Sequence, residues 1–343
     1  MVAQIDKKMI KARPFKTLGR FLAWGLFEGR PLTTKGRWIN FLVFAGYRLA
    51  QLLPISKKSE SPIYIVGTGR SGTTILGKLF AIHKETIFLN EPKALWHFAC
   101  GNEDIIGSYS TEGGNVRLNE HDATATVATK IQKIYTYILK LTLAKRVVDK
   151  YPECIFRVKF ILKLIPNARF IAIVRDGVDT CSSVDDWSKR NSVRVEGETH
   201  DWWGRNDQKW KILVNEIVPE HDDLKKLKSL LLCTTDHKDR AALEWILAMR
   251  EAKIASEEYK EVLTISYESL CENTEVVISD VLSHCNLEPD QKFSDYANSI
   301  FYSAPTYSPI EIMPELVKPF KQTLIEMGYH KSVDRVHARK PTK

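Results

Sequence analysis

Short runs of apolar, mostly β-branched residues recur along the chain, separated by longer stretches with helical periodicity. The runs lie at residues 63–66, 86–89, 155–158, 170–174 and 262–265. Residues 73–82 and 130–148 are examples of the helix-period stretches between them. Buried strands that alternate with helices are typical of a parallel sheet covered on both faces. The pattern therefore predicts an α/β fold of three layers, with a central parallel sheet flanked by helices.

Two polar stretches interrupt this alternation. Residues 100–126 are rich in Gly, Asn, Ser, Thr and Asp, which is typical of a surface loop or lid. Residues 185–240 are strongly charged and carry four of the eight tryptophans. Both stretches follow the expected end of a strand, and that edge is where α/β sheets bind ligands.

The first 60 residues differ in charge from the rest of the chain. They hold 12 Lys and Arg against 3 Asp and Glu, a net charge of +9, whereas residues 61–343 hold 38 against 39, a net charge of −1. The sequence therefore predicts a basic, amphipathic helical extension over residues 1–60, a polar linker near residues 56–62, and one large domain over residues 61–343. A neutral main domain gives no reason to expect nucleic acid as a partner.

The basic extension has two open interpretations. Residues 38–53 are strongly apolar, but these 16 residues are fewer than the roughly 20 needed to span a bilayer. Upstream, Phe15, Leu18 and Phe21 alternate with basic residues, which suits helices lying on an anionic membrane surface. In the other interpretation, both helices pack on the main domain and the charges form its solvated face.

The leader lacks the pattern of a secretory signal, so we expect a cytoplasmic protein, either free or attached peripherally to a membrane. Six cysteines are scattered without a CxxC pair or a histidine at ligand spacing. We therefore expect reduced thiols rather than a zinc site or a disulfide framework. No carboxylate cluster has the spacing of metal ligands, and we expect no metal.

A glycine-rich string from Gly67 to Thr74, GTGRSGTT, follows the first expected strand and opens a helix. In this context backbone N–H groups can surround one phosphate. A nucleoside-triphosphatase loop would carry a lysine after its last glycine, whereas Thr73 occupies that position. The string therefore disfavours ATP or GTP, and Arg70 is its basic residue.

The segment from Thr68 to Thr74 resembles the 5′-phosphosulfate loop of the sulfotransferase family, in the style of members that modify carbohydrates and protein tyrosines. The resemblance implies a P-loop-type fold and the donor 3′-phosphoadenosine-5′-phosphosulfate (PAPS). It also implies that the donor's 5′ side is bound by five residues of the loop, namely Arg70, Ser71, Gly72, Thr73 and Thr74.

A second string resembles the 3′-phosphate site of the same family, in which an arginine at a strand end acts with a serine eight residues later. Here these residues are Arg175 and Ser183, and Gly177 stands where the family often has proline. Tyr267 begins a segment similar to the family's Y-E-x-L motif near the nucleotide. Residues 324–329 resemble its closing L-G-Y segment, with Met327 in place of leucine.

In-line sulfuryl transfer requires a group that stabilises the leaving oxygen and a general base. Arg70 suits the first role. Glu91 is the preferred base, because it follows the second expected strand and resembles the glutamate of the family's E-P-x-W-H stretch, here one residue longer. His97 is the rival base, and Lys159 is a weaker candidate near the transferred group. We expect His83 to lie on the surface.

The acceptor is expected to be a carbohydrate or glycolipid hydroxyl, because flat aromatic faces suit sugar rings. Tryptophans that could provide such faces are Trp96, Trp187, Trp202, Trp203 and Trp210. For any one of them, ordinary packing is the simpler explanation. Two other functions stay open: a phosphotransferase with a degenerate loop, and a non-catalytic nucleotide-binding protein at a membrane.

Overall fold

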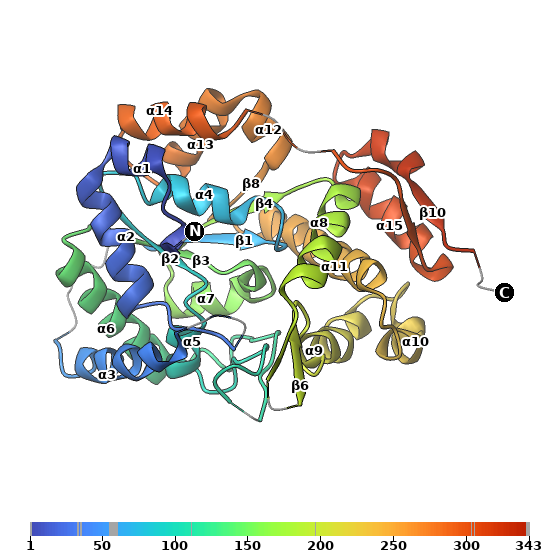
Figure 1. The fold of residues 1–343 in the computed structure, drawn as a ribbon, viewed down its shortest axis with the longest axis horizontal. Helices are drawn as coiled ribbons and strands as arrows, with labels where there is room; N and C mark the ends of the chain where they lie inside the picture. Colours follow the sequence, from blue (N-terminus) through green and yellow to red (C-terminus); the bar gives the residue numbers. More distant parts are fainter. Residues whose placement is uncertain are drawn as a thin grey trace.

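A computed structural model describes residues 2–340 except residues 33, 35, 55–60, 111, 196, 303 and 305. Most of the expected linker lies outside the described residues. The centre of the molecule is a sheet of five parallel strands (Figure 1). In spatial order these are β2 (Thr86–Asn90), β3 (Arg146–Lys150), β1 (Ile63–Gly67), β4 (Arg169–Val174) and β8 (Val262–Ser266).

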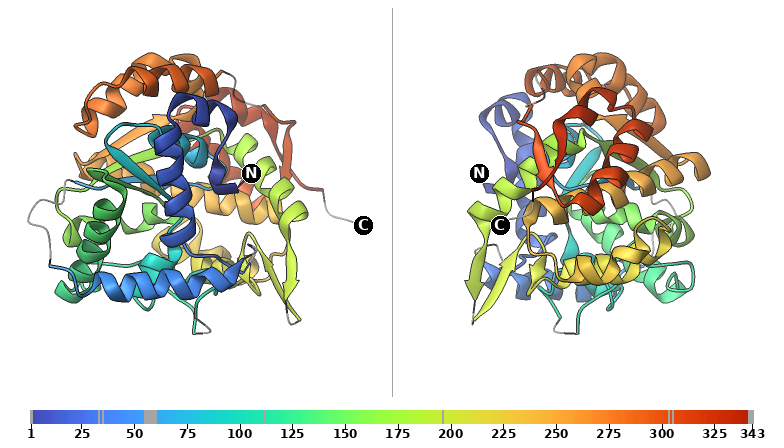
Figure 2. Two further views of the ribbon diagram at one scale, coloured as in Figure 1. Left: turned by 60° about the vertical axis from the view of Figure 1, so that its left-hand side comes forward. Right: turned by 90° about the vertical axis from the view of Figure 1, so that its right-hand side faces the viewer.

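Helices cover both faces of this sheet (Figures 1 and 2). Alternate residues of β1 belong to two separate cores, with Tyr64 and Val66 in one and Ile63 and Ile65 in the other. This alternation follows from the period of two in a strand. The predicted three-layer α/β fold of the P-loop type, with a central parallel sheet flanked by helices, is confirmed.

The remaining elements follow in chain order, with η denoting a 3₁₀ helix. The first half contains η1 (Val2–Gln4), α1 (Lys7–Ala12), α2 (Pro14–Leu26), η2 (Arg37–Ile39), α3 (Asn40–Ala50), α4 (Thr73–Phe80), α5 (Lys93–Ala99), α6 (Ala125–Thr142), η3 (Pro152–Arg157) and α7 (Val158–Leu164). The second half contains α8 (Gly177–Asn191), β5 (Val193–Val195), β6 (Glu198–Asp201), β7 (Gly204–Arg205), α9 (Gln208–Glu216), η4 (Val218–Glu220), η5 (Lys225–Leu227), α10 (Lys228–Leu232), α11 (His237–Glu258), α12 (Tyr267–Glu272), α13 (Thr274–His284), α14 (Gln291–Ile300), β9 (Ile310–Ile312), α15 (Pro314–Glu326), η6 (His330–Arg335) and β10 (Val336–Ala338).

One expected strand was placed wrongly. Residues 155–158 form the end of η3 and the start of α7, and the strand lies at β3 instead, which overlaps the end of the stretch 130–148 that the periodicity assigned to a helix. Helix α6 ends at Thr142 because Leu143 takes a left-handed conformation with φ of 53°. Only two residues then separate Leu143 from β3, too few for a polar turn signal.

The N-terminal extension packs on the main domain and shares its cores. Helix α2 lies along the β2 edge of the sheet (Figure 2). Phe27 and Tyr47 are fully buried in the same core as Tyr64, and Met9 is buried in the core on the other face. Arg20 of α2 is buried and pairs with Glu28. Within the described residues, no helix combines the length and apolar character needed to cross a membrane.

Two further expectations concern His83 and the cysteines. His83 is fully buried rather than exposed: its Nε2 lies 3.0 Å from the carbonyl of Glu288, its ring packs edge-on against Phe293, and burial lowers its pKa. The turn after α4 folds inward against α14, and periodicity within α4 does not reveal this. All six cysteines are free thiols, of which only Cys233 is exposed.

Candidate active site

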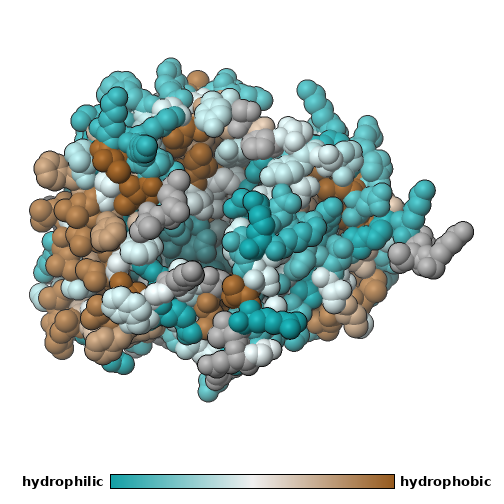
Figure 3. Space-filling model, viewed as in Figure 1, coloured by the Kyte–Doolittle hydropathy of each residue, from teal (hydrophilic) through white to brown (hydrophobic). Residues whose placement is uncertain are grey.

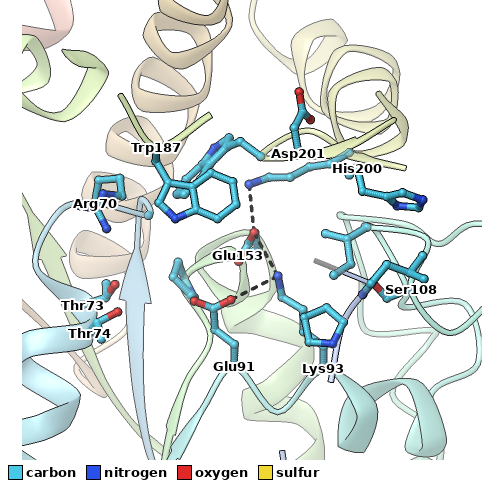
Figure 4. A pocket seen from close by; sticks show the side chains of 18 of the residues that line it. Arg70, Thr73, Thr74, Glu91, Lys93, Ser108, Glu153, Trp187, His200 and Asp201 are labelled. Carbon is cyan, nitrogen blue, oxygen red and sulfur yellow. Dashed lines mark hydrogen bonds and ion pairs between the residues drawn. The ribbon is translucent and has the colours of Figure 1, made fainter. Parts of the chain in front are cut away.

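A cavity of about 210 Å³ lies at the carboxyl ends of β1, β2 and β3 (Figure 4). Arg70, Thr73 and Thr74 line it from the loop after β1, and Glu91 and Lys93 line it from the segment after β2. Both polar stretches also contribute, through Ile106 and Ser108 from residues 100–126 and through Trp187, His200 and Trp202 from residues 185–240. The cavity therefore occupies the edge where α/β folds bind ligands.

The glycine-rich loop turns sharply and is closely packed. Gly72 has φ of 101°, and a Cβ there would lie 2.4 Å from the Tyr267 ring. At Gly69 a Cβ would lie 2.3 Å from the Trp202 ring. Helix α4 begins at Thr73, so its first N–H groups, which have no acceptors within the helix, point toward the loop. This arrangement can hold an anionic group at the helix N-terminus.

Arg70 meets the residues predicted for the 3′ side of the donor. Its Nε donates to Ser183 Oγ at 3.0 Å, and its carbonyl oxygen accepts from Arg175 Nη1 at 3.0 Å. Arg175 and Ser183 are both buried. The structure thus brings two guanidinium groups and a hydroxyl together beside the loop, although they come from strings about one hundred residues apart.

Tyr267 lies beneath this group rather than in the cavity wall. The guanidinium carbon of Arg175 lies 5.0 Å from the centre of its ring, and burial raises the pKa of its hydroxyl to about 12. The ring therefore stays neutral and can stabilise Arg175 through a cation–π contact.

The turn between β4 and α8 is held by the segment that begins at Tyr267 and by the closing segment at residues 324–329, the two other segments that resemble the family. Asp176 caps α8 by accepting from the N–H groups of Val178 and Asp179. Glu268 accepts from the Asp176 N–H and from the Tyr329 hydroxyl, each at 3.0 Å. The Y-E and closing G-Y segments therefore hold the backbone beside Arg175 without entering the cavity.

Glu91 lies across the cavity from Thr73 and Thr74 (Figure 4). Its φ of 50° is unusual for a residue other than glycine, and 37% of its side chain is exposed. Lys150 Nζ lies 2.5 Å from Oε1, and Lys93 Nζ lies 3.4 Å from Oε2. Although burial opposes ionisation, these two ammonium groups hold the pKa of Glu91 below its ordinary value. Glu91 is therefore a carboxylate at neutral pH.

A chain of alternating charges continues from Glu91 along the cavity (Figure 4). Lys93 Nζ lies 3.9 Å from Glu153 Oε1, which Lys209 Nζ approaches to 3.0 Å. Lys209 also pairs with Glu244 at 2.6 Å, and the Trp202 indole N–H donates to Glu244 at 2.7 Å. Burial opposes the ionisation of Glu153, but Lys209 and Lys93 keep its pKa low. The chain connects Glu91 to Trp202 and hence to the phosphate loop.

Sequence reasoning missed Lys150, Glu153 and Lys209. Lys150 ends β3, and it escaped notice because that strand was not recognised in the sequence. Its side chain is almost completely buried, and a buried lysine at a strand end facing a glycine-rich loop is a strong signal once β3 is recognised. Glu153 and Lys209 meet only in the folded chain, since 55 residues separate them, and no sequence motif marks them.

The other predicted residues lie away from the cavity. The His97 ring stacks on Tyr109 with 5.7 Å between ring centres and packs edge-on against Phe44. Burial lowers its pKa. Lys159 is 60% exposed on α7, where it pairs with Glu120 at 3.3 Å. Neither side chain lines the cavity with Glu91.

The five tryptophans divide into two groups. Trp187 and Trp202 line the cavity, with ring centres 5.2 Å apart. Trp96, Trp203 and Trp210 are fully buried, and each indole N–H donates to an internal acceptor. For these three, packing is the explanation that the structure supports. In the described part of the chain, no group of three or more His, Cys, Asp or Glu side chains is placed to hold a metal ion.

In a comparison with protein families, residues 62–228 match the model described as "Sulfotransferase family". This stretch contains the glycine-rich loop, Glu91, Arg175 and Ser183. Over residues 62–228, the chain therefore matches the sulfotransferase family. Members are enzymes that transfer a sulfuryl group, and PAPS is their usual donor. No curated protein matches the chain.

Solved structures similar to this chain include three sulfotransferases. One is a sulfotransferase domain from the curacin biosynthetic pathway (13% identity, 79% of this chain, 98% of that chain, TM-score 0.47). The others are sulfotransferases from Mycobacterium avium (14%, 98% and 94%, TM-score 0.44) and Alicyclobacillus acidocaldarius (14%, 81% and 97%, TM-score 0.42). The family assignment rests on the match over residues 62–228 and not on these distant structures.

Proposed function

We propose that this protein transfers the sulfuryl group of PAPS to a hydroxyl of a carbohydrate or glycolipid. One observation carries the proposal. Arg70 of the predicted 5′ loop is hydrogen-bonded to both residues of the predicted 3′ site, Arg175 and Ser183, while an ionised Glu91 lines the same cavity as Arg70. This supports a donor loop and a base that line one cavity, as an in-line displacement requires.

The loop residues would bind the 5′ end of the donor. Arg70, with the N–H groups of Ser71, Gly72, Thr73 and Thr74, would stabilise the charge that develops on the leaving oxygen. Arg175 and Ser183 would bind the 3′-phosphate through a charge-assisted fork and a hydroxyl. Lys150 lies beside the same space and would add positive charge near the transferred group.

Glu91 would act as the general base. During transfer, a bond forms between the acceptor oxygen and sulfur, and the bond between sulfur and the 5′-phosphate oxygen breaks. The hydroxyl proton goes to the Glu91 carboxylate. Lys150 and Lys93 would position that carboxylate, and Glu153 with Lys209 would hold Lys93 in place.

The cavity wall supports a sugar acceptor. Trp187 and Trp202 offer flat aromatic faces, and His200 and Asp201 offer groups that can bond to hydroxyls. Pro31 and Leu32 of the N-terminal extension also line the cavity, and the Leu32 N–H donates to Ser108 at 3.2 Å. Attachment of residues 1–60 to an anionic membrane would therefore bring a glycolipid acceptor close to the proposed base.

A thermal-shift comparison tests the donor. Adenosine 3′,5′-bisphosphate at about 100 times its Kd is expected to stabilise the protein by about 2.7 kcal/mol, which corresponds to a rise in Tm of roughly 4 °C. ATP with magnesium is expected to give little shift, because the loop lacks the triphosphate lysine.

A shift with ATP and magnesium but not with the bisphosphate would identify a phosphotransferase and contradict the proposal. A bisphosphate shift without turnover of PAPS on any glycan tested would identify a binding protein.

A further inference from the structure

Exposed apolar side chains gather on one side of the molecule. Of the 18 large hydrophobic side chains that are exposed among the described residues, 11 lie within residues 10–52 and 141–143. Ten of these define what we call the apolar face: Phe15, Leu18 and Phe21 of α2, Trp38, Phe41, Leu42, Leu49 and Leu52 in and beside α3, and Leu141 and Leu143 at the end of α6. Figure 3 shows hydrophobic residues gathered on its left-hand side, where Figure 1 places α2, α3 and α6.

Several of these side chains are exposed to an extent that folding alone does not explain. Phe15 is 89% exposed, Trp38 76%, Phe41 75% and Leu143 91%. The three helices contact one another, so the face is continuous although α6 lies outside the N-terminal extension. A contiguous apolar surface of this kind marks an interaction site.

The same helices contain no acidic residue. Helices α2, α3 and α6 carry six basic residues, and η2 adds Arg37. Within residues 1–54 the acidic residues are Asp6 and Glu28, and both are paired, with Lys78 and Arg20 respectively. Arg37, Arg48 and Lys140 are exposed. The face therefore combines apolar side chains with uncompensated positive charge.

A groove of about 200 Å³ opens on this side, between α2 and residues 142–144. Phe15 and Leu143 line it together with Lys16 and Lys84. Its wall thus mixes apolar and cationic groups, the combination that an anionic lipid headgroup and the start of its acyl chain would meet.

We propose that the apolar face docks on the surface of an anionic bilayer. Aromatic and leucine side chains would enter the interfacial region, and the surrounding Lys and Arg would contact acidic headgroups. A second copy of the chain is a poorer occupant, because a twofold interface would bring two positively charged faces together. The inference rests on surface chemistry and does not depend on the sulfuryl donor.

Vesicle sedimentation of the full chain tests this docking. Vesicles of phosphatidylcholine with phosphatidylglycerol are expected to bind the protein, pure phosphatidylcholine to bind it weakly, and added salt to release it. The double variant Trp38→Ser, Phe41→Ser is expected to bind the vesicles at least about tenfold more weakly than the parent. The reason is that two large side chains are no longer buried in lipid. Arg37→Glu with Arg48→Glu is expected to abolish the preference for the anionic lipid.

A matched control replaces exposed apolar residues elsewhere, Val276→Ser with Tyr302→Ser, and is expected to bind like the parent. All variants are expected to keep the bisphosphate thermal shift, so folding and docking are measured separately. Parent-like binding by both face variants would overturn the proposal. So would an absence of vesicle binding by the parent, or a concentration-dependent dimer in light scattering that the face variants abolish.

Discussion

Replacing Glu91 with glutamine is expected to lower kcat by about 10²–10⁴-fold, the range in which general base catalysis contributes. Glutamine keeps the size of the side chain and an oxygen that can accept from Lys150, but it cannot take a proton. Affinity for adenosine 3′,5′-bisphosphate is expected to stay close to that of the parent, since Glu91 follows β2 and is not part of the loop and strand end proposed to bind the nucleotide. Initial rates with PAPS and calorimetric titration measure the two effects separately.

His97→Gln is the matched control for the choice of base. Because His97 packs between Tyr109 and Phe44 outside the cavity, this variant is expected to keep most of the parent's kcat. The reverse result, an active Glu91→Gln and an inactive His97→Gln of parent-like stability, would assign the base to His97.

The pH dependence of the rate provides a second readout for Glu91. Its folded pKa lies below the ordinary 4.5, so the active carboxylate form is present throughout neutral pH and is lost only as the pH falls through that lowered value. Activity is therefore expected to show no acid limb between neutral pH and about pH 4.5.

Arg70→Ala is expected to lower kcat by about 10²–10³-fold, the cost of removing one donor from a preorganised anion-stabilising site. The guanidinium sits in the loop with its Nε on Ser183, so its loss also loosens the proposed 3′ site. We therefore expect KM for PAPS to rise as well, and initial-rate kinetics with varied PAPS measure both parameters.

Arg190→Ala is the control for this charge change, because Arg190 lies nearby on α8 with an exposed side chain that bonds to a backbone carbonyl. It is expected to change kcat and KM little. Equal losses in the two variants would show that Arg70 acts through overall charge and not as a placed donor.

The sequence could predict the glycine-rich loop and the Arg175–Ser183 string, because each is specified by residues that are close together in the chain. A glycine-rich turn between strand and helix is specified by adjacent residues, so Arg70, Gly72 and Thr73 appear in their structural context within one short string. The same holds for Arg175 and Ser183, because Arg175 directly follows β4 and Ser183 lies in α8, the next helix along the chain.

The misplaced strand shows where this local information ended. Residues 146–150 follow α6 with almost no turn, and Val147 and Val148 fit a helix period as well as a strand. The error hid Lys150, the closest cationic partner of Glu91. Contacts such as Glu153 with Lys209 depend on how an insertion folds back over the sheet, which no local pattern encodes.

The extension illustrates a different limit. Its amphipathic helices fitted both a membrane surface and packing on the domain, and the structure shows packing together with exposed apolar residues on the outer side. Composition could not separate the buried Phe27 from the exposed Phe15, since that difference depends on how α2 and the residue after it pack on the domain.

Calorimetric titration with adenosine 3′,5′-bisphosphate, comparing the parent with Arg175→Ala, tests the proposed donor site most directly. A charge-assisted hydrogen bond contributes about 1.5–3 kcal/mol, so the variant is expected to bind roughly ten to one hundred times more weakly, with its melting temperature checked in parallel. Parent-like affinity in a folded Arg175→Ala would show that the nucleotide is not bound where the two strings meet, and would contradict the account.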